Sequence, residues 1–170
     1  MQKYFHTPLV DFTIRFATEE DTPLILQFIR DLAEYEHMLD QVVATEEILR
    51  VSLFEKKQAE VIIGEYKGIP VGFALFFHNF STFLGKANLY LEDLFVMPSA
   101  RGKGFGKILL AFLGKIALDR GCGRLDWWCL DWNTSSIDFY LEMGALPMSD
   151  WTVYRVEGDR LNQLASPNPI

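Results

Sequence analysis

The chain has 170 residues, of which 49% are hydrophobic and 14% aromatic, and its formal net charge is −7. This composition excludes a largely disordered protein, and the length suits a single domain with a full core. The acidic balance argues against general nucleic-acid binding, which needs a basic surface, and is compatible with a cationic substrate. We expect one domain over residues 1–170, with its core at about 12–165.

The surroundings of the protein are indicated by three kinds of residue pattern. No apolar run approaches the roughly 20 residues of a transmembrane helix, and the first 12 residues lack the long apolar core of a signal peptide. The cysteines, Cys122 and Cys129, form neither a disulfide framework nor a metal-ligand pattern, and the three histidines are scattered. We expect reduced thiols, no metal, no membrane partner and a cytoplasmic protein.

The first half of the chain has the pattern of a strand, two helices and a hairpin. Residues 1–10 are expected to form a loose arm, whereas Phe12–Phe16 alternates as a strand does. Two helix starts compete in the next segment, a capping box led by Thr18 and a proline, Pro23, at a first helical position. Thr45 is expected to cap a second helix. The hairpin strands are expected at 59–66 and 71–80.

The second half is built around an apolar strand at 89–96, which Pro98 ends because proline has no N–H to donate. A helix over about 104–119 follows, and its apolar side is wide enough to pack against a sheet. Later strands are expected at 124–130 and 152–156, and later helices at 133–143 and 159–164. Strands mixed with helices, and a hairpin in the middle, predict an α/β domain with a mixed sheet.

A glycine-rich turn between that strand and helix is the main candidate for a binding site. It consists of Arg101, Gly102, Lys103, Gly104, Phe105, Gly106 and Lys107. Glycines before a helix let a ligand approach the backbone, and the free N–H groups and the helix dipole attract an anion. The spacing is that of neither a P-loop nor a dinucleotide fingerprint. By itself, the turn fits a phosphate site and a tight connection equally well.

The pattern becomes specific when the turn is considered with its flanking strand and helix and with two later segments. The order strand, Arg-Gly-Lys-Gly-Phe-Gly, helix resembles the acetyl-CoA signature of the GCN5-related N-acetyltransferases (GNAT), with Arg101, Gly104 and Gly106 at its fixed positions. The segments LDWN at 130–133 and DFY at 138–140 resemble the diamine branch of that family, the spermidine/spermine and thialysine acetyltransferases. The resemblance covers nearly the whole chain.

The resemblance implies a fold and a set of partners. The expected fold has a central, mostly antiparallel sheet in which two parallel strands splay apart to hold acetyl-CoA, the cosubstrate. The implied partners are a small-molecule amine and a second copy of the chain in a homodimer. The backbone of Leu94, Phe95 and Val96 would pair with the pantetheine arm, because an unpaired strand edge can bind an extended chain.

Two side chains are candidates for the proton transfers of acetyl transfer. Glu92 lies in an apolar strand, where a buried carboxylate would be ready to accept a proton from the amine. The pattern alone slightly favours an exposed position, and the resemblance favours the base. Tyr140 shares a helix face with Asn133 and Ser136, and a phenol can protonate the departing thiolate. A packing role is commoner for a lone tyrosine, but the resemblance favours catalysis and implies that the other two contact the cofactor.

The acceptor amine is expected to meet acidic and aromatic side chains. The candidates are Glu36, Glu92, Asp126, Trp127, Trp128 and Trp132. Aromatic rings attract alkylammonium groups by about 0.5–2 kcal/mol. Alternation along the strand requires one of the two adjacent tryptophans, Trp127 or Trp128, to be in the core. For Glu36, a solvated acidic helix end is an equally good explanation. Met38 and Leu39 are less acidic than the matching residues of polyamine enzymes, which favours thialysine or another small diamine.

We therefore predict an N-acetyltransferase that transfers acetyl from acetyl-CoA to a primary amine of a small diamine, polyamine or thialysine-like substrate. Direct transfer is expected because the sequence offers no persuasive nucleophile: nothing cationic flanks Cys129. Acetylation of a protein N-terminus or of an antibiotic amine is one alternative. A non-catalytic acyl-CoA sensor is another, although a sensor would not need Glu92, Asn133 and Tyr140.

Overall fold

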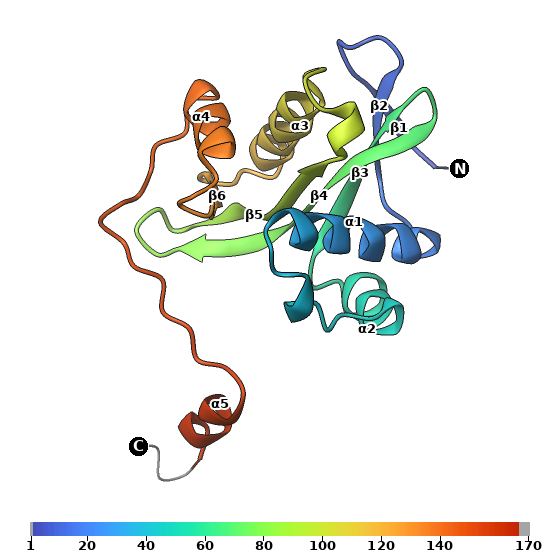
Figure 1. Cartoon of the computed structure of the whole chain (residues 1–170). Helices are drawn as coiled ribbons and strands as arrows, with labels where there is room; N and C mark the ends of the chain where they lie inside the picture. Colours follow the sequence, from blue (N-terminus) through green and yellow to red (C-terminus); the bar gives the residue numbers. More distant parts are fainter. Residues whose placement is uncertain (1, 167–170) are drawn as a thin grey trace. The chain divides into compact units, whose positions relative to one another are not determined.

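The computed structural model describes residues 2–166 and contains two compact units, Met1–Leu130 and Asp131–Ile170 (Figure 1). The first unit contains β1 (Tyr4–His6), β2 (Phe12–Phe16), α1 (Thr22–Tyr35), α2 (Glu46–Arg50), β3 (Glu60–Tyr66), β4 (Ile69–Ser81), β5 (Lys86–Val96), α3 (Phe105–Asp119) and β6 (Leu125–Trp127). The second unit contains α4 (Thr134–Glu142) and α5 (Asp159–Leu164). The single-domain organisation stays a prediction.

Six strands form one sheet in the order β1-β2-β3-β4-β5-β6. Every neighbouring pair is antiparallel except β5 and β6, which are parallel. The long hairpin of β4 and β5 lies inside the sheet, and its strands pair from Gly72 opposite Val96 to Ser81 opposite Lys86. The predicted α/β class, with a mostly antiparallel sheet and one parallel pair, is confirmed.

One face of the sheet is covered by α1 and α2. Ile25 and Phe28 of α1 and Leu49 of α2 are buried in one cluster with strand residues such as Phe73. The rings of Phe28 and Phe73 stack with their centroids 5.4 Å apart. Burial of a large apolar side chain contributes about 1.5–3 kcal/mol, so this cluster fixes the position of α1 against β4 and β5.

The other face is covered by α3. The ring of Phe105, at the first position of α3, stacks on Phe12 of β2 at 4.3 Å. At Gly64 of β3, an added Cβ would lie 2.7 Å from the Phe12 ring and 3.4 Å from Leu109 of α3. Glycine is therefore needed where the helix and the sheet approach most closely. This packing fixes the N-terminal end of α3 beside the end of β3.

A buried ion network ties β2, β3 and the start of α1 together. Arg15, which is 6% exposed, donates from Nε to Glu65 at 2.6 Å and from both terminal nitrogens to Asp21 at 2.7 Å. The N–H and hydroxyl of Thr18 also donate to Asp21, at 2.7 and 3.1 Å. The capping box forms over a short helical turn, and α1 then begins beside Pro23, so both predicted start signals are used.

The N-terminal segment is not the loose arm that we expected. Tyr4–His6 pairs with β2 and adds a strand at the edge of the sheet. The Phe5 ring packs on Phe16 at 6.1 Å and on Phe112 of α3 at 4.9 Å. A strand of three residues is too short for alternation to reveal it, and these contacts come from residues distant in the sequence.

Two predicted strands differ from the structure. The segment 124–130 pairs only at Leu125–Trp127, because β6 leaves β5 after three residues. The segment 152–156 is not a strand in the part of the chain that the structure describes. A strand needs a partner as well as an alternating pattern. The predicted helices at 104–119, 133–143 and 159–164 are confirmed to within one or two residues.

Candidate active site

The pairing between β5 and β6 is short and leaves an open edge. Residues 89–91 of β5 lie opposite 125–127 of β6, whereas β5 continues to Val96. Among the residues that the structure describes, no strand pairs with β5 beyond Leu91 on this side. The open edge at 92–96 is long enough to accept an extended ligand as an additional strand.

Leu94 and Val96 present their backbone groups to this edge. The carbonyl of Phe95 points toward β4, since an added Cβ at Gly72 would lie 2.5 Å from its oxygen. Backbone groups of successive residues in a strand point to opposite sides. Those of Leu94 and Val96 therefore face away from β4. The side chain of Phe95 is buried, at 3% exposure, so this residue supports the edge from the core.

The glycine-rich turn follows β5 directly and has the backbone expected of an anion site. Gly102 and Gly104 have φ angles of 76° and 83°, in the left-handed region that favours glycine. No atom lies within 4 Å of a Cβ added at Gly102, so the backbone there is open. The first N–H groups of α3 have no partner within the helix, and Lys103 and Lys107 are exposed beside them. The turn therefore fits a pyrophosphate group.

Phe105 and Arg101 take part in this turn in different ways. The ring of Phe105 is buried, so only its backbone is available to a ligand. The Nε of Arg101 donates to the carbonyl oxygen of Val96 at 2.9 Å, and its guanidinium lies 4.6 Å from the Tyr35 ring centroid. Arg101 therefore links the turn to the end of β5 and the end of α1.

A β-bulge at Glu92 separates the two adjacent carboxylates of β5. Leu75 of β4 pairs with Asp93, whereas Phe76 pairs with Leu91, so Glu92 has no cross-strand partner. Cross-strand partners share a face of the sheet, and Leu75 belongs to the core under α1, so Asp93 also faces α1. Glu92 is exposed and Asp93 is half-buried. The exposure of Glu92 agrees with the slight preference of its sequence pattern, and Asp93 is the more buried of the two carboxylates.

Three carboxylates influence one another at this position. Burial, followed by the charges of Glu92 and Glu36, raises the pKa of Asp93 to about 7. Glu36 follows α1 directly and is half-buried, and this burial raises its pKa as well. Carboxylates held together repel one another and attract a cation. The cluster of Glu36, Glu92 and Asp93, which we call the acidic cluster, can hold an ammonium group.

Tyr90 adds an aromatic ring to the same face. It pairs with Phe77, with ring centroids 5.0 Å apart, and meets Trp128 edge-on at 6.0 Å. Burial, followed by the charges of Glu92 and Asp126, raises the pKa of Tyr90 above its usual range. Because of the bulge, Tyr90 and Asp93 share a face at a spacing of three residues. Simple alternation places them on opposite faces, and Tyr90 was not among the predicted site residues.

The other predicted substrate residues of the first unit lie on or after β6. Trp127 is half-buried, and Trp128 is 58% exposed, so neither is fully in the core. Asp126 accepts a hydrogen bond from Nε of Arg124 at 2.8 Å. Trp128 therefore remains the more accessible ring for an alkylammonium group.

The remaining predicted residues belong to the second unit. Asn133 is the N-cap of α4, and its Oδ1 accepts the N–H of Ser136 at 3.3 Å. Tyr140 is half-buried, with its ring 5.2 Å from that of Phe139. Trp132, just before the helix, is 50% exposed. The predicted helix start is confirmed, and the roles of these residues toward cofactor and substrate stay predictions.

The described residues contain neither a metal-ligand group nor a membrane-spanning helix. No group of three or more His, Cys, Asp or Glu side chains in residues 2–166 is arranged to hold a metal ion. No helix in the same residues is long and apolar enough to cross a membrane. Cys122 and Cys129 are both half-buried.

An open strand edge that leads into a glycine-rich helix start has the form of a site for an extended chain that carries an anionic group. Residues 25–145 match the family model described as Acetyltransferase (GNAT) family, and the chain therefore belongs to this family of N-acetyltransferases, which use acetyl-CoA. The resemblance stated from the motifs is confirmed, including its diamine branch.

Individual relatives agree with this placement. The thialysine N-epsilon-acetyltransferase of Bos taurus is 38% identical over 164 residues, which cover 89% of this chain and 96% of that protein. The L-ornithine N5-acetyltransferase NATA1 of Arabidopsis thaliana is 30% identical, with 91% and 88% covered. Among solved structures, the integron cassette protein VCH_CASS6 from the mobile metagenome of V. cholerae is similar with a TM-score of 0.77 and 30% identity, over 92% of this chain and 99% of that one.

Proposed function

We propose that the protein acetylates the terminal primary amine of a small diamine, with acetyl-CoA as the donor and by direct transfer. The observation that carries this proposal is the acidic cluster beside the open edge of β5. Carboxylates there favour an acceptor with a second ammonium group. Two similar proteins are named for thialysine and ornithine, which both combine a terminal amine with an α-ammonium group. This supports a diamino acid as acceptor more than a polyamine.

The glycine turn and the open edge would bind the donor. The backbone of 102–106 would hold the pyrophosphate, and Leu94 and Val96 would pair with the pantetheine amides. When bound, acetyl-CoA supplies a thioester carbonyl that an amine can attack. The backbone N–H of Leu94 faces the edge, which supports it as a donor to the oxyanion that develops during attack.

Glu92 would accept the proton of the amine. It lies at the first position of the open edge and is exposed, which supports transfer through a bridging water. Glu36, at the end of α1, and Asp93, which faces α1, are both half-buried and would hold the second ammonium group. The amine nitrogen then forms a bond to the carbonyl carbon, the carbon–sulfur bond breaks, and the thiolate leaves. Tyr140 would protonate this thiolate, a role that rests on the family resemblance.

A panel of amines tests the proposal. Release of free thiol from acetyl-CoA would be followed with thialysine, ornithine, spermidine, an aminoglycoside and a peptide with a free N-terminus, and the products identified by mass spectrometry. We expect the two diamino acids to be the best acceptors. Glu36→Gln should raise KM for ornithine but not for pentylamine, a monoamine of similar length. No thiol release with any amine would contradict an enzyme of this kind and favour an acyl-CoA sensor.

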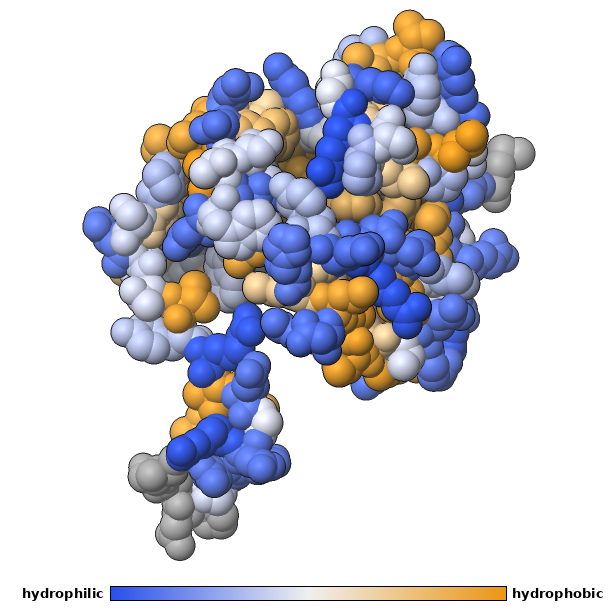
Figure 2. Space-filling model, in the orientation of Figure 1, coloured by the Kyte–Doolittle hydropathy of each residue, from blue (hydrophilic) through white to orange (hydrophobic). Residues whose placement is uncertain are grey.

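We also propose a homodimer and a cytoplasmic location. The homodimer is supported by large apolar side chains of the second unit that are exposed within one chain. Trp151, Val153 and Tyr154 are 72%, 54% and 90% exposed. Leu161 and Leu164 of α5 are 53% and 56% exposed, and orange side chains lie among blue ones around α5 in Figure 2. Such surface usually indicates an interaction site. Light scattering that gives the mass of one chain at micromolar concentration would contradict the dimer.

A further inference from the structure

The open edge of β5 ends where β6 leaves it. Leu91 and Trp127 are the last residues of the two strands that pair, and Glu92 and Trp128 follow them without pairing. We call these four residues the fork. Leu91 is 2% exposed and Trp127 is half-buried, so the fork rests on the core of the sheet. A ligand that follows the open edge away from the glycine turn therefore reaches the fork.

Aromatic rings line one side of the fork. Trp128 meets Tyr90 edge-on, with ring centroids 6.0 Å apart and an interplanar angle of 86°. Tyr90 in turn packs on Phe77 of β4 at 5.0 Å. Aromatic pairs of this kind are favourable beyond the area that they bury. Trp128 is therefore held in place by the rings behind it, although 58% of its surface is exposed.

The direction of the donor along the open edge follows from its two ends. With the pyrophosphate on the glycine turn, the pantetheine arm would extend from Val96 toward Glu92. A strand presents backbone groups to one edge at every second residue, about 6.6 Å apart, so the two amides of the arm would match Val96 and Leu94. The thioester follows the second amide after a short linker. Its acyl group would then lie at the fork, against Trp128.

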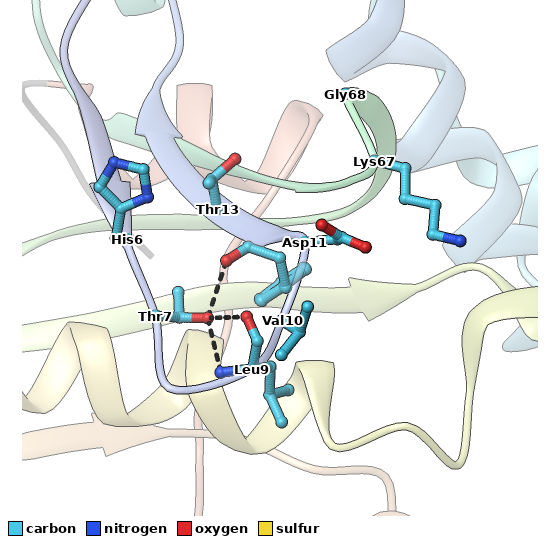
Figure 3. Close-up of a pocket in the computed structure, with 9 residues that line it drawn as sticks. His6, Thr7, Leu9, Val10, Asp11, Thr13, Lys67 and Gly68 are labelled. Carbon is cyan, nitrogen blue, oxygen red and sulfur yellow. Dashed lines mark hydrogen bonds between the residues drawn. The ribbon is translucent and has the colours of Figure 1, made fainter.

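Two depressions elsewhere in the first unit do not extend the fork. One, of about 460 Å³, lies between the β1–β2 loop and the β3–β4 turn (Figure 3). Its lining comes from residues between His6 and Thr13 and from Lys67 and Gly68. The other, of about 600 Å³, lies at the C-terminal end of α3 and includes Leu125 of β6 but no residue of the fork. Neither offers room to an acyl chain that is too long for the fork.

We propose that Trp128 sets the length of the acyl group that the enzyme can transfer, and restricts it to acetyl and, less well, propionyl. The inference rests on the proposed function and deepens it, because it names a residue that determines donor specificity. The methyl of an acetyl group fits at the fork beside the rings. Each further methylene is directed at the Trp128 ring, and one methylene that does not fit changes kcat/KM by about 10- to 200-fold.

A panel of acyl-CoA donors tests the inference. We would measure kcat/KM for acetyl-, propionyl-, butyryl- and hexanoyl-CoA with the best acceptor of the amine panel above at saturation. The acceptor can touch Trp128 as well, and a change in its affinity cancels in the ratio of two donors. We expect butyryl-CoA to be at least about 100-fold poorer than acetyl-CoA for the wild-type protein. Trp128→Ala should raise the ratio of butyryl-CoA to acetyl-CoA at least about tenfold, and Trp128→Phe should give an intermediate ratio.

Phe83→Ala is the matched control. Phe83 is an aromatic residue in the turn between β4 and β5 and is 94% exposed, so the ratio of the two donors should stay that of the wild type. Equal use of acetyl- and butyryl-CoA by the wild-type protein, or an unchanged ratio in both Trp128 variants, would overturn the inference and leave the proposed function standing. Loss of turnover with every donor in both variants would overturn it too, because Trp128 would then be required for the acceptor. A wild-type protein that uses no donor at all would overturn the proposed function as well.

Discussion

Replacing Asp93 by asparagine should make the protein more stable and less able to bind a diamine. Asp93 is half-buried beside Glu36 and Glu92, and these surroundings raise its pKa from 3.8 to about 7. Its negative charge is therefore unfavourable in the folded protein and costs nothing in the unfolded chain. Asparagine has nearly the same shape and never ionises. A carboxylate that is kept to bind a cation is expected to lower the free energy of unfolding, because residues selected for function are often unfavourable for stability.

The sign and the size of the effect follow from the two pKa values. The folded protein holds this proton more tightly than the unfolded chain, so the free energy of unfolding falls as the pH rises from about 4 to about 7. The rise in the pKa of Asp93 from 3.8 to about 7 corresponds to at most about 4 kcal/mol in the free energy of unfolding, and screening by solvent makes the effect smaller. The stability difference between the variant and the wild type should grow from near zero at pH 4 to its maximum above pH 7.

Urea unfolding, followed by tryptophan fluorescence at several pH values between 4.5 and 8.5, measures this difference. Asp40→Asn is the matched control, because Asp40 is exposed after α1; its effect should stay within about 0.5 kcal/mol. A stability difference for Asp93→Asn that does not change with pH would refute the reasoning. A variant less stable than wild type at pH 8 would show that the charged carboxylate has a favourable partner in the folded protein.

Four other substitutions test the remaining assignments. Glu92→Gln should lower kcat/KM at neutral pH and recover partly at high pH, where free amine accumulates; a loss independent of pH would make it a binding residue. Tyr140→Phe should lower kcat by about 10²–10⁴-fold with little change in acetyl-CoA affinity, and near-normal kcat would refute the acid role. Gly104→Val should raise KM for acetyl-CoA, because a β-branched residue does not tolerate a φ of 83°; unchanged affinity in a folded variant would remove the turn from the site. Arg15→Met should destabilise the fold by about 3–5 kcal/mol, because it leaves Glu65 buried and unpaired, and an unchanged urea midpoint would contradict this.

The sequence predicted most of the helices and strands and marked the glycine-rich turn as the candidate donor site. The pattern of apolar residues predicted the strand at 89–96 and the helix after it, because periodicity and glycine conformation are local properties. The spacing of Arg101, Gly104 and Gly106, together with the segments at 130–133 and 138–140, indicated the family. Thr45 was predicted as a helix cap for the same reason, since a cap depends on the three residues that follow it.

The tertiary structure decided which carboxylate is buried and which strands exist. Alternation treats Glu92 and Asp93 as equivalent, and only the register with β4 shows that a bulge exposes one and turns the other toward α1. Likewise, Tyr4–His6 is a strand because it pairs with β2. Within the segment 124–130, only Leu125–Trp127 forms a strand, because only these residues pair with β5. Strand pairing and bulges depend on a partner strand that is distant in the sequence. The proton affinity of Asp93 therefore follows from the assembled sheet and not from its neighbours in the chain.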